Sequence, residues 1–321
     1  MPSPNTTFTE MVTTTLRKHY TEVTDNVSKN NALYTYIKEK GNIKTVSGGY
    51  EIAVPLDYAE NGTYTRYSNY DPLNVQASEV LSAAKYDWGQ VAIHVSASGR
   101  EIRMNNSREA MINLVKSRVK NAMRTAANNM SIDIYSDGSL SNQIGGLGLL
   151  IQNAGTGTVG GINSTTYPFW QNKVREMAGT NTWSSATIVG EMGQLWLPLV
   201  RGTDKPDLLI FSHDVYNAYE GALQQNQRYM DARSARAGFE VLKYKTADVI
   251  FDDNSNFGTT AESGYFLNTD YLFMIQHTDA KWSQDDDKVP VNQDAVVMPI
   301  YWMGQLVCSN RSLQGKLIDI A

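Results

Sequence analysis

The stretch from residue 48 to residue 98 decides the fold: GGYEIAVPLDYAENGTYTRYSNYDPLNVQASEVLSAAKYDWGQVAIHVSAS. Two runs with strand-like alternation, 50–56 and 86–97, flank a polar middle that carries the turn pairs Asn61-Gly62 and Asp71-Pro72. Pro55 marks an edge or an end of the first strand, because proline cannot donate to a sheet ladder. The pattern predicts a long two-stranded loop between two helical segments.

Tyrosines crowd the middle of this loop, at positions 58, 64, 67 and 70. Aromatic and polar surface at a loop tip finds no core of its own chain in which to be buried. Tyrosine brings contact area and a hydroxyl group at a low cost in rotamer entropy. The sequence therefore predicts that the loop contacts a neighbouring subunit, through Tyr58, Tyr64, Arg66, Tyr67 and Tyr70.

The composition fits a globular protein of about two domains. The chain has 321 residues, of which 41% are hydrophobic and 19% charged, so it can bury a sizeable core. A net charge of −5 argues against a surface built throughout to bind nucleic acid. Cys308 is the only cysteine, which excludes an intrachain disulfide and fits a reducing compartment. Neither a signal peptide nor an apolar run of the ~18 residues that span a bilayer is evident, so we expect no membrane partner.

Two helices flank the loop. Residues 8–40 show near-helical spacing of apolar side chains and are expected to form either an ordinary surface helix or an arm that bridges subunits. Residues 107–135 give the strongest helical pattern, with Ser107 as a possible cap and an apolar stripe through Leu114 and Met130. At ~1.5 Å per residue, this second helix would be about 40 Å long.

The long helix and the turn before it are rich in basic residues. Acidic neighbours are few, and they include Glu101 and Glu109. The excess predicts either a solvated helix face or a surface turned toward nucleic acid or acidic neighbours. The residues assigned to this basic face are Arg103, Arg108, Lys116, Lys120 and Arg124.

The remainder of the chain mixes helices and strands. We expect a helix over 183–200, a strand at 206–212 followed by a helix over 213–230, and strands at 249–253, 265–277, 295–308 and 316–321. Strands and helices that mix without strict alternation predict an α+β fold with a discontinuous outer domain.

Motifs that would carry chemistry are weak. Residues 155–160 match GxGxxG, but the residues that follow oppose a helix, so the phosphate-binding context fails. Ser212, His213 and Asp214 are adjacent and indicate a helix start rather than a converging triad. Residues 285–287 are three aspartates, more typical of a solvated loop than of a cation site. We therefore assign no catalytic, cofactor-binding or metal-binding residue and expect no enzyme.

The order of these parts resembles the major capsid proteins of tailed bacteriophages, which have the Hong Kong 97 phage-type fold. The resemblance rests on several pieces in one order, which together cover most of residues 80–280: AAKYDWGQVAIHVSASGREIRMNNSREAMINLVKSRVKNAM, NNMSIDIYSDG with IGGLGLLI, RGTDKPDLLIFSHDVYNAYEGALQQNQRY, and ADVIFDD with GYFLNTDYLFMIQH. It implies an N-terminal arm (1–47), an extended loop (48–98), a peripheral domain with a long spine helix (99–136 and 263–321) and an axial domain (137–262).

The resemblance also implies a function and partners. Subunits would form pentamers and hexamers that close into an icosahedral shell around phage DNA, assembled in the host cytoplasm and found in the virion. A separate scaffolding protein and a portal are the implied partners, and some capsids of this kind add a decoration protein. Some similar proteins link subunits through a lysine on the extended loop. This chain has no lysine between Lys44 and Lys85, so we expect a non-covalent shell.

Two alternatives stay open from the sequence. One is another virion structural protein, such as a tail or decoration protein, which would share the tyrosine-rich and cysteine-poor composition. The other, less favoured, is a nucleotide-dependent enzyme that uses the glycine loop at 155–160.

Overall fold

The computed structural model describes residues 32–104, 108–177, 183–224, 242–252, 263–284 and 292–319. The side chains of residues 102–116 fall outside this description, although the helices there are described. The predicted N-terminal arm is therefore described only from residue 32 onward. There, α1 runs from Ala32 to Glu39, and Gly41 follows its end with a φ of +74°, which suits glycine.

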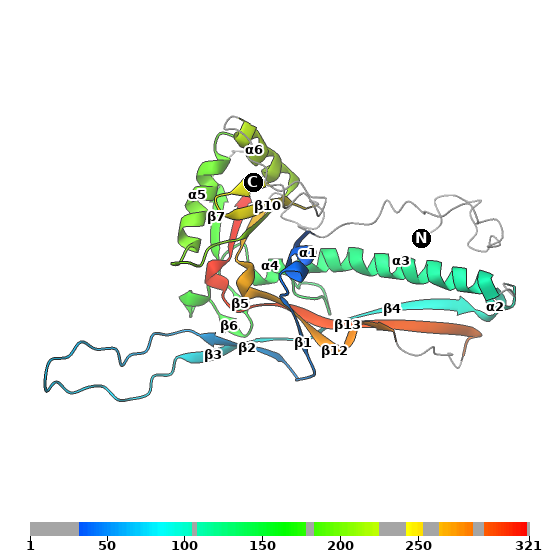
Figure 1. Cartoon of the computed structure of the whole chain (residues 1–321), viewed down its shortest axis with the longest axis horizontal. Coiled ribbons are helices and arrows are strands. Elements are labelled where there is room, and N and C mark those ends of the chain that lie inside the picture. Colours follow the sequence, from blue (N-terminus) through cyan, green and yellow to red (C-terminus); the bar gives the residue numbers. More distant parts are fainter. Residues whose placement is uncertain are drawn as a thin grey trace.

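Three parts extend in different directions from a shared centre (Figure 1). A two-stranded ribbon reaches to one side, a long helix lies along a sheet on the opposite side, and a helix-covered sheet rises above them. The ribbon pairs β2 (Ile52–Asp57) with β3 (Leu81–Tyr86), in register from Ile52↔Tyr86 to Asp57↔Leu81. Residues 58–80 connect these strands and are called the arm loop. The strands and the arm loop together are called the arm.

The long helix α3 (Arg108–Ile134) lies beside a four-stranded sheet. The sheet order is β1 (Ile43–Val46), β12 (Leu272–Gln284), β13 (Ala295–Cys308) and β4 (Gly89–Ser98). Strand β1 runs parallel to β12, and the other neighbours are antiparallel. The short helix α2 (Gly99–Met104) follows β4 directly.

The second sheet has six strands and carries two helices on one face. Its order is β7 (Lys173–Met177), β14 (Gly315–Asp319), β11 (Ser263–Leu267), β8 (Leu208–Phe211), β10 (Ala247–Phe251) and β9 (Leu242–Tyr244). Helices α5 (Ile188–Leu199) and α6 (His213–Gln224) cover it. The sheet draws strands from both the predicted peripheral and the predicted axial ranges, whose boundary remains a prediction.

The hydrophobic core consists of two clusters, and successive side chains along a buried strand point into different ones. On β8, Leu209 and Phe211 pack under α5 and α6, whereas Leu208 and Ile210 face a larger cluster. That larger cluster joins the arm strands, α1, the end of α3, the short helix α4 (Leu147–Leu150) and the four-stranded sheet. The arm base is thereby part of the main core.

A buried arginine, Arg311, connects three separate segments of the chain by hydrogen bonds. Arg311 is fully buried in the short 3-10 helix Arg311–Leu313. Its guanidinium donates to the carbonyl oxygens of Leu150 (2.6 Å) and Trp170 (3.0 Å) and to Oδ1 of Asn172 (2.8 Å). Burial lowers the pKa of Arg311 from its usual value. Hydrogen bonds to neutral acceptors offset part of the cost of burying this charge.

Most predicted elements are confirmed. The helix expected over 107–135 is α3, the strand at 295–308 is β13, and the strand-helix unit after residue 206 is β8 and α6. The helix expected over 183–200 begins later, at Ile188, because Ser184 starts a turn whose carbonyl accepts from Thr187 and Ile188. Within the described ranges, both helices and sheets are present without strict alternation, as an α+β fold requires.

Two strand predictions were wrong. Residues 86–97 do not return alongside 50–56: the return strand is β3, and β4 pairs with β13 instead. The single strand expected over 265–277 is two strands in different sheets, β11 and β12, separated by the 3-10 turn Thr269–Tyr271. That turn is capped by Asn268, whose side chain accepts from the Asp270 amide.

Candidate assembly interface

The base of the arm is held firmly against the core. The Tyr86 hydroxyl donates to the Cys308 carbonyl at 2.9 Å, and the Lys85 amide donates to the Gly160 carbonyl at 2.9 Å. Gly160 has a φ of +60°, and a Cβ there would lie 2.9 Å from the Cβ of Ala84. Both facts favour glycine, which lets the small hairpin β5–β6 (Thr158–Val159 and Ile162–Asn163) approach the arm.

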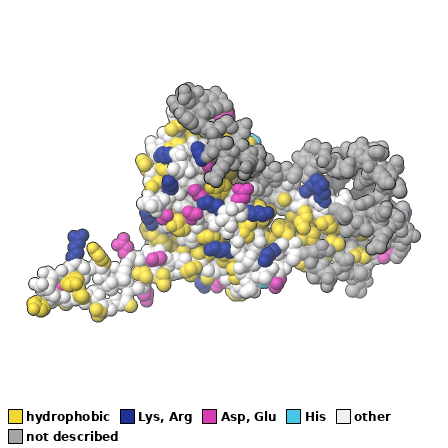
Figure 2. Space-filling model, viewed as in Figure 1, with side chains coloured by type: hydrophobic (Ala, Val, Ile, Leu, Met, Phe, Trp, Pro, Cys, Tyr) yellow, Lys and Arg dark blue, Asp and Glu magenta, His cyan; other side chains and the backbone are white. Residues whose placement is uncertain are grey.

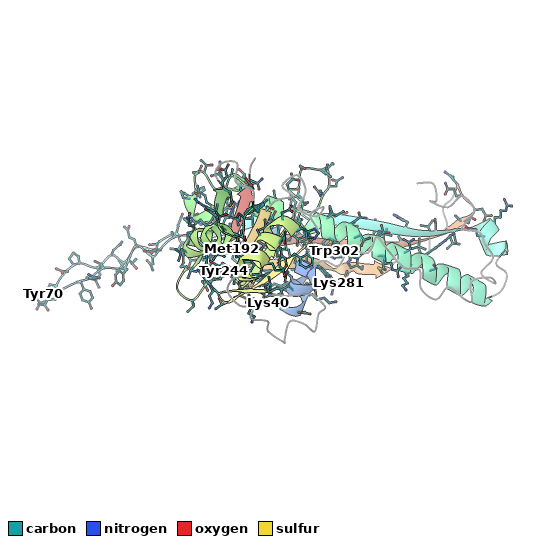
Figure 3. The ribbon with its side chains drawn as sticks, turned by 90° about the horizontal axis from the view of Figure 1, so that it is seen from above. Lys40, Tyr70, Met192, Tyr244, Lys281 and Trp302 are labelled. Carbon is teal, nitrogen blue, oxygen red and sulfur yellow. The ribbon has the colours of Figure 1, made fainter. Side chains whose placement is uncertain are left out.

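The arm loop carries its large side chains into solvent. Tyr64 is 83% exposed, Tyr67 65% and Tyr70 100%. Tyr70 lies at the far end of the arm (Figure 3), and apolar side chains follow the arm to its tip (Figure 2). Arg66 is exposed among them. An exposed apolar surface of this kind marks an interaction site.

Tyr58 behaves differently from the other predicted contact residues. It is half-buried, and its ring lies 5.8 Å from that of Phe169 in the same chain. Phe169 in turn neighbours Tyr167 and Trp170. The structure therefore places Tyr58 in an aromatic cluster at the root of the arm loop, where it supports the arm.

Short-range turns shape the arm loop. The Asn61 side chain accepts from the amide and the hydroxyl of Thr63, and Asp71 accepts from the Ser68 amide at 2.8 Å. Asn69 sits in the left-handed region at φ +41°. The Asn61 contact is the Asx turn expected of an Asn-Gly pair, whereas Asp71 closes a turn over residues 68–71, in which its amide donates to the Ser68 carbonyl.

The predicted basic face is only partly described. The side chains of Arg103, Arg108 and Lys116 lie outside the described residues. Lys120 is exposed and Arg124 is half-buried. Arg118, a basic neighbour, is engaged elsewhere: its guanidinium pairs with Glu101 at 2.8 Å and donates to the Ser96 carbonyl at 2.6 Å.

Glu101 also completes a capping box that the sequence analysis missed. The Ser98 amide donates to the Glu101 carboxylate at 2.9 Å, and the Glu101 amide donates to the Ser98 hydroxyl. The signal was Ser-x-x-Glu at the start of α2. The hydrogen bonds from Arg118 and Ser98 lower the pKa of Glu101 to about 2.

The two weak chemical motifs have structural roles. The glycine segment at 155–160 contains strand β5 and the start of the β5–β6 turn, and β6 follows it instead of a helix, so it lacks the helix N-terminus that a dinucleotide phosphate needs. His213 begins α6, and the Ser212 carbonyl accepts from the Tyr216 amide as an N-cap residue does. The aspartates at 285–287 lie outside the described residues.

The described residues contain neither a candidate metal site nor a candidate membrane-spanning helix. In those ranges, no three His, Cys, Asp or Glu side chains gather closely enough to hold a metal ion. The same part of the chain contains no helix long and apolar enough to cross a membrane.

Comparison with solved structures identifies the architecture. The cyanophage A-1(L) capsid asymmetric unit matches with a TM-score of 0.59 at 13% identity, over 87% of this chain and 90% of that chain. The fold is that of a phage capsid protein. A Microbacterium phage Oxtober96 structure matches at 0.56 and 9% identity over 94% of both chains, and the capsid of a native GTA particle at 0.54 and 10% over 88% and 89%. No family model and no curated protein sequence matches.

The capsid fold confirms the resemblance on which the sequence analysis relied. The likeness extends over nearly the whole length of each neighbour, so it is not confined to one shared motif. Identities of 9–13% explain why no sequence comparison finds it.

Proposed function

We propose that the chain is the major capsid subunit of a tailed phage, with a structural role in the virion. Subunits would assemble as pentamers and hexamers into a closed icosahedral shell that encloses DNA. The observation that carries this proposal is the arm. It projects from a capsid-type fold and ends in exposed tyrosines that no surface of its own chain covers within the described residues.

The proposal gives each part of the molecule a place in the shell. The six-stranded sheet with α5 and α6 would gather around the five- and six-fold axes, and α3 with the four-stranded sheet would form the periphery. A separate scaffolding protein, a portal and a decoration protein are the partners that would assemble with the shell. The packaged DNA would be enclosed without sequence readout, in keeping with the net charge of −5.

Shortening the arm tests the proposal. Replacing residues 58–80 by Asn-Gly joins Asp57 to Leu81, which are already paired, through a two-residue hairpin turn. We expect thermal unfolding within a few degrees of the wild type, because the arm loop contributes no residue to either core cluster and only its Tyr58–Phe169 contact is lost. We expect shells, measured by analytical sedimentation, to be lost.

A milder variant serves as the control for the length of the arm. Tyr64→Ser, Tyr67→Ser and Tyr70→Ser together keep the loop and remove its aromatic surface, and should also reduce shell yield. Normal shells from the shortened chain would refute the role of the arm in assembly.

A further inference from the structure

The turn at Asn61-Gly62 directs three hydrogen-bond donors at one side-chain oxygen. Oδ1 of Asn61 accepts from the Thr63 amide at 3.0 Å, from the Thr63 hydroxyl at 2.8 Å and from the Ser78 hydroxyl at 3.4 Å. The Thr63 donors belong to the turn itself, whereas Ser78 comes from the returning half of the arm loop. Together the donors withdraw electron density from the carboxamide carbon, Cγ, and make that carbon more electrophilic.

The backbone nitrogen of Gly62 is a nucleophile next to this carbon. Because Gly62 follows Asn61 directly, attack of its nitrogen on Cγ closes a five-membered ring. Glycine has no Cβ to shield the nitrogen, and Asn61 is the only asparagine in the sequence that precedes a glycine. Both residues are exposed, so water has access to the ring that would form.

Ser78 contacts both reacting groups. The Gly62 amide donates to the Ser78 hydroxyl oxygen at 3.2 Å, and the same hydroxyl donates to Oδ1 of Asn61. The hydroxyl can therefore take the proton from the attacking nitrogen and give its own proton to the oxygen on which negative charge develops. The Thr63 donors stabilise the same charge. The turn thus holds the nucleophile, the electrophile and a proton relay together before any reaction begins.

We propose that Asn61 deamidates without an enzyme, through a succinimide, assisted by Ser78 and Thr63. The Gly62 nitrogen bonds to Cγ of Asn61 while its proton passes through Ser78 to Oδ1. The bond between Cγ and Nδ2 then breaks, the proton on Oδ1 moves to the leaving nitrogen, and ammonia departs. Water opens the ring at one of its two carbonyl carbons and leaves aspartate or isoaspartate at position 61.

The two products change the arm in different ways. Aspartate keeps an acceptor oxygen for the Thr63 amide and hydroxyl, and it adds a negative charge beside Glu60. Isoaspartate routes the main chain through the former side chain, which lengthens the backbone by a carbon atom and breaks the turn. The reaction is therefore a slow, irreversible change in the charge and the path of the arm loop. It concerns the single chain and does not depend on the proposed shell function.

Comparison of the native and the unfolded chain tests whether the structure promotes the reaction. The purified chain is held at one pH and temperature with and without urea, and the peptide that contains Asn61 is followed by mass spectrometry after digestion. We expect faster deamidation of Asn61 in the native chain, because unfolding separates Ser78 from Asn61 and Gly62. An equal or slower rate in the native chain would overturn the proposal.

Variants at Ser78 test the proton relay. Ser78→Ala should slow deamidation of the native chain about fivefold, the rate equivalent of a single neutral hydrogen bond, and should leave the rate in urea unchanged. Ser78→Thr keeps a hydroxyl group and should restore most of the native rate. If the native Ser78→Ala chain reacts as fast as the wild type, the relay does not exist.

Gly62→Ala tests the attacking nitrogen. Gly62 does not lie in the left-handed region, and a Cβ there would be 3.4 Å from Oγ of Ser78, which is an ordinary contact. The turn should therefore persist while the added methyl group hinders attack, and deamidation should slow in both the native and the unfolded chain. An unchanged rate would argue against a succinimide.

Asn74 is the matched control site within the arm loop. It is exposed, and its side chain accepts from the Gln76 amide at 3.1 Å in the same kind of turn. Val75 follows it, and the branched Cβ of valine shields the backbone nitrogen. We expect Asn74 to remain intact in the sample in which Asn61 reacts. Comparable deamidation at both sites would show that exposure alone, and not the arrangement around Asn61, governs the reaction.

Discussion

At the scale of single residues, Lys316 is a charged side chain that is almost completely buried. It lies in β14, only 2% exposed, with its Nζ 4.7 Å from the ring centre of Tyr265 on the paired strand β11. Burial lowers the pKa of Lys316 to about 8. Its cation–π contact offsets part of the cost of burying the ammonium group.

The depressed pKa of Lys316 predicts a pH-dependent stability. Between about pH 8 and the usual lysine pKa of 10.5, the unfolded chain holds a proton that the folded chain has released. The free energy of unfolding should therefore rise with pH across that window, by up to about 3 kcal/mol, and the full cost of the charge is present below pH 8. Urea unfolding of the wild type and of Lys316→Met between pH 7 and 9.5 measures this.

The difference between the two proteins isolates the lysine from other groups that titrate in this range. Lys316→Met should be more stable at pH 7, and the difference should shrink toward pH 9.5. Lys205→Met, at an exposed position, should leave the free energy of unfolding unchanged at both pH 7 and pH 9.5. A constant difference over the whole range would contradict a neutral Lys316 above pH 8.

At the scale of elements, the sequence predicted the local structures well and their partners poorly. The apolar stripe of α3 and the continuous run of β13 are local signals, and both elements lie where the patterns place them. The partner of β4 is β13, about two hundred residues later, and no local pattern encodes that choice. Likewise, β11 and β12 read as one apolar run because both are buried, although they belong to different sheets.

At the candidate interface, too, local features could be predicted from the sequence and long-range contacts could not. Composition and turn chemistry predicted an exposed tyrosine-rich loop, and Tyr64, Tyr67 and Tyr70 are exposed. The sequence could not show that the ring of Tyr58 packs against that of Phe169, because that contact depends on the path of a loop more than a hundred residues away. It also could not show that Arg118 is drawn to Glu101 and Ser96.

The junction of β4, α2 and α3 should be destabilised at low pH. Glu101 caps α2 and pairs with Arg118 of α3, and its carboxylate pKa is lowered to about 2 from 4.5. Its contribution to folding is therefore fully present above pH 4.5 and is lost as the pH falls toward 2. Because the pair is partly solvated, we expect about 1–2 kcal/mol.

Glu101→Gln measures that contribution. The variant should be less stable than the wild type at pH 7 by this amount, and the difference should vanish as the pH approaches 2, with urea unfolding as the readout. Glu60→Gln, at an exposed position on the arm loop, is the matched control and should have no effect. A loss of stability that is the same at every pH would show that the ion pair is not its cause.

At the scale of the whole molecule, the order of the parts carried the identification of the fold. A long loop, a long helix, a mixed central block and late strands that return to the helix together resemble the phage capsid proteins, and the solved capsids match over most of their length. The irregular outline in Figure 1 supports the same view. A projecting arm whose apolar side chains are exposed leaves surface that a second copy can bury.

The most direct measurement is negative-stain electron microscopy of the purified chain, expressed alone and held at high concentration. The proposed shell function predicts closed shells, or rings of five and six subunits. A population of single subunits at every concentration, with neither rings nor shells, would contradict it.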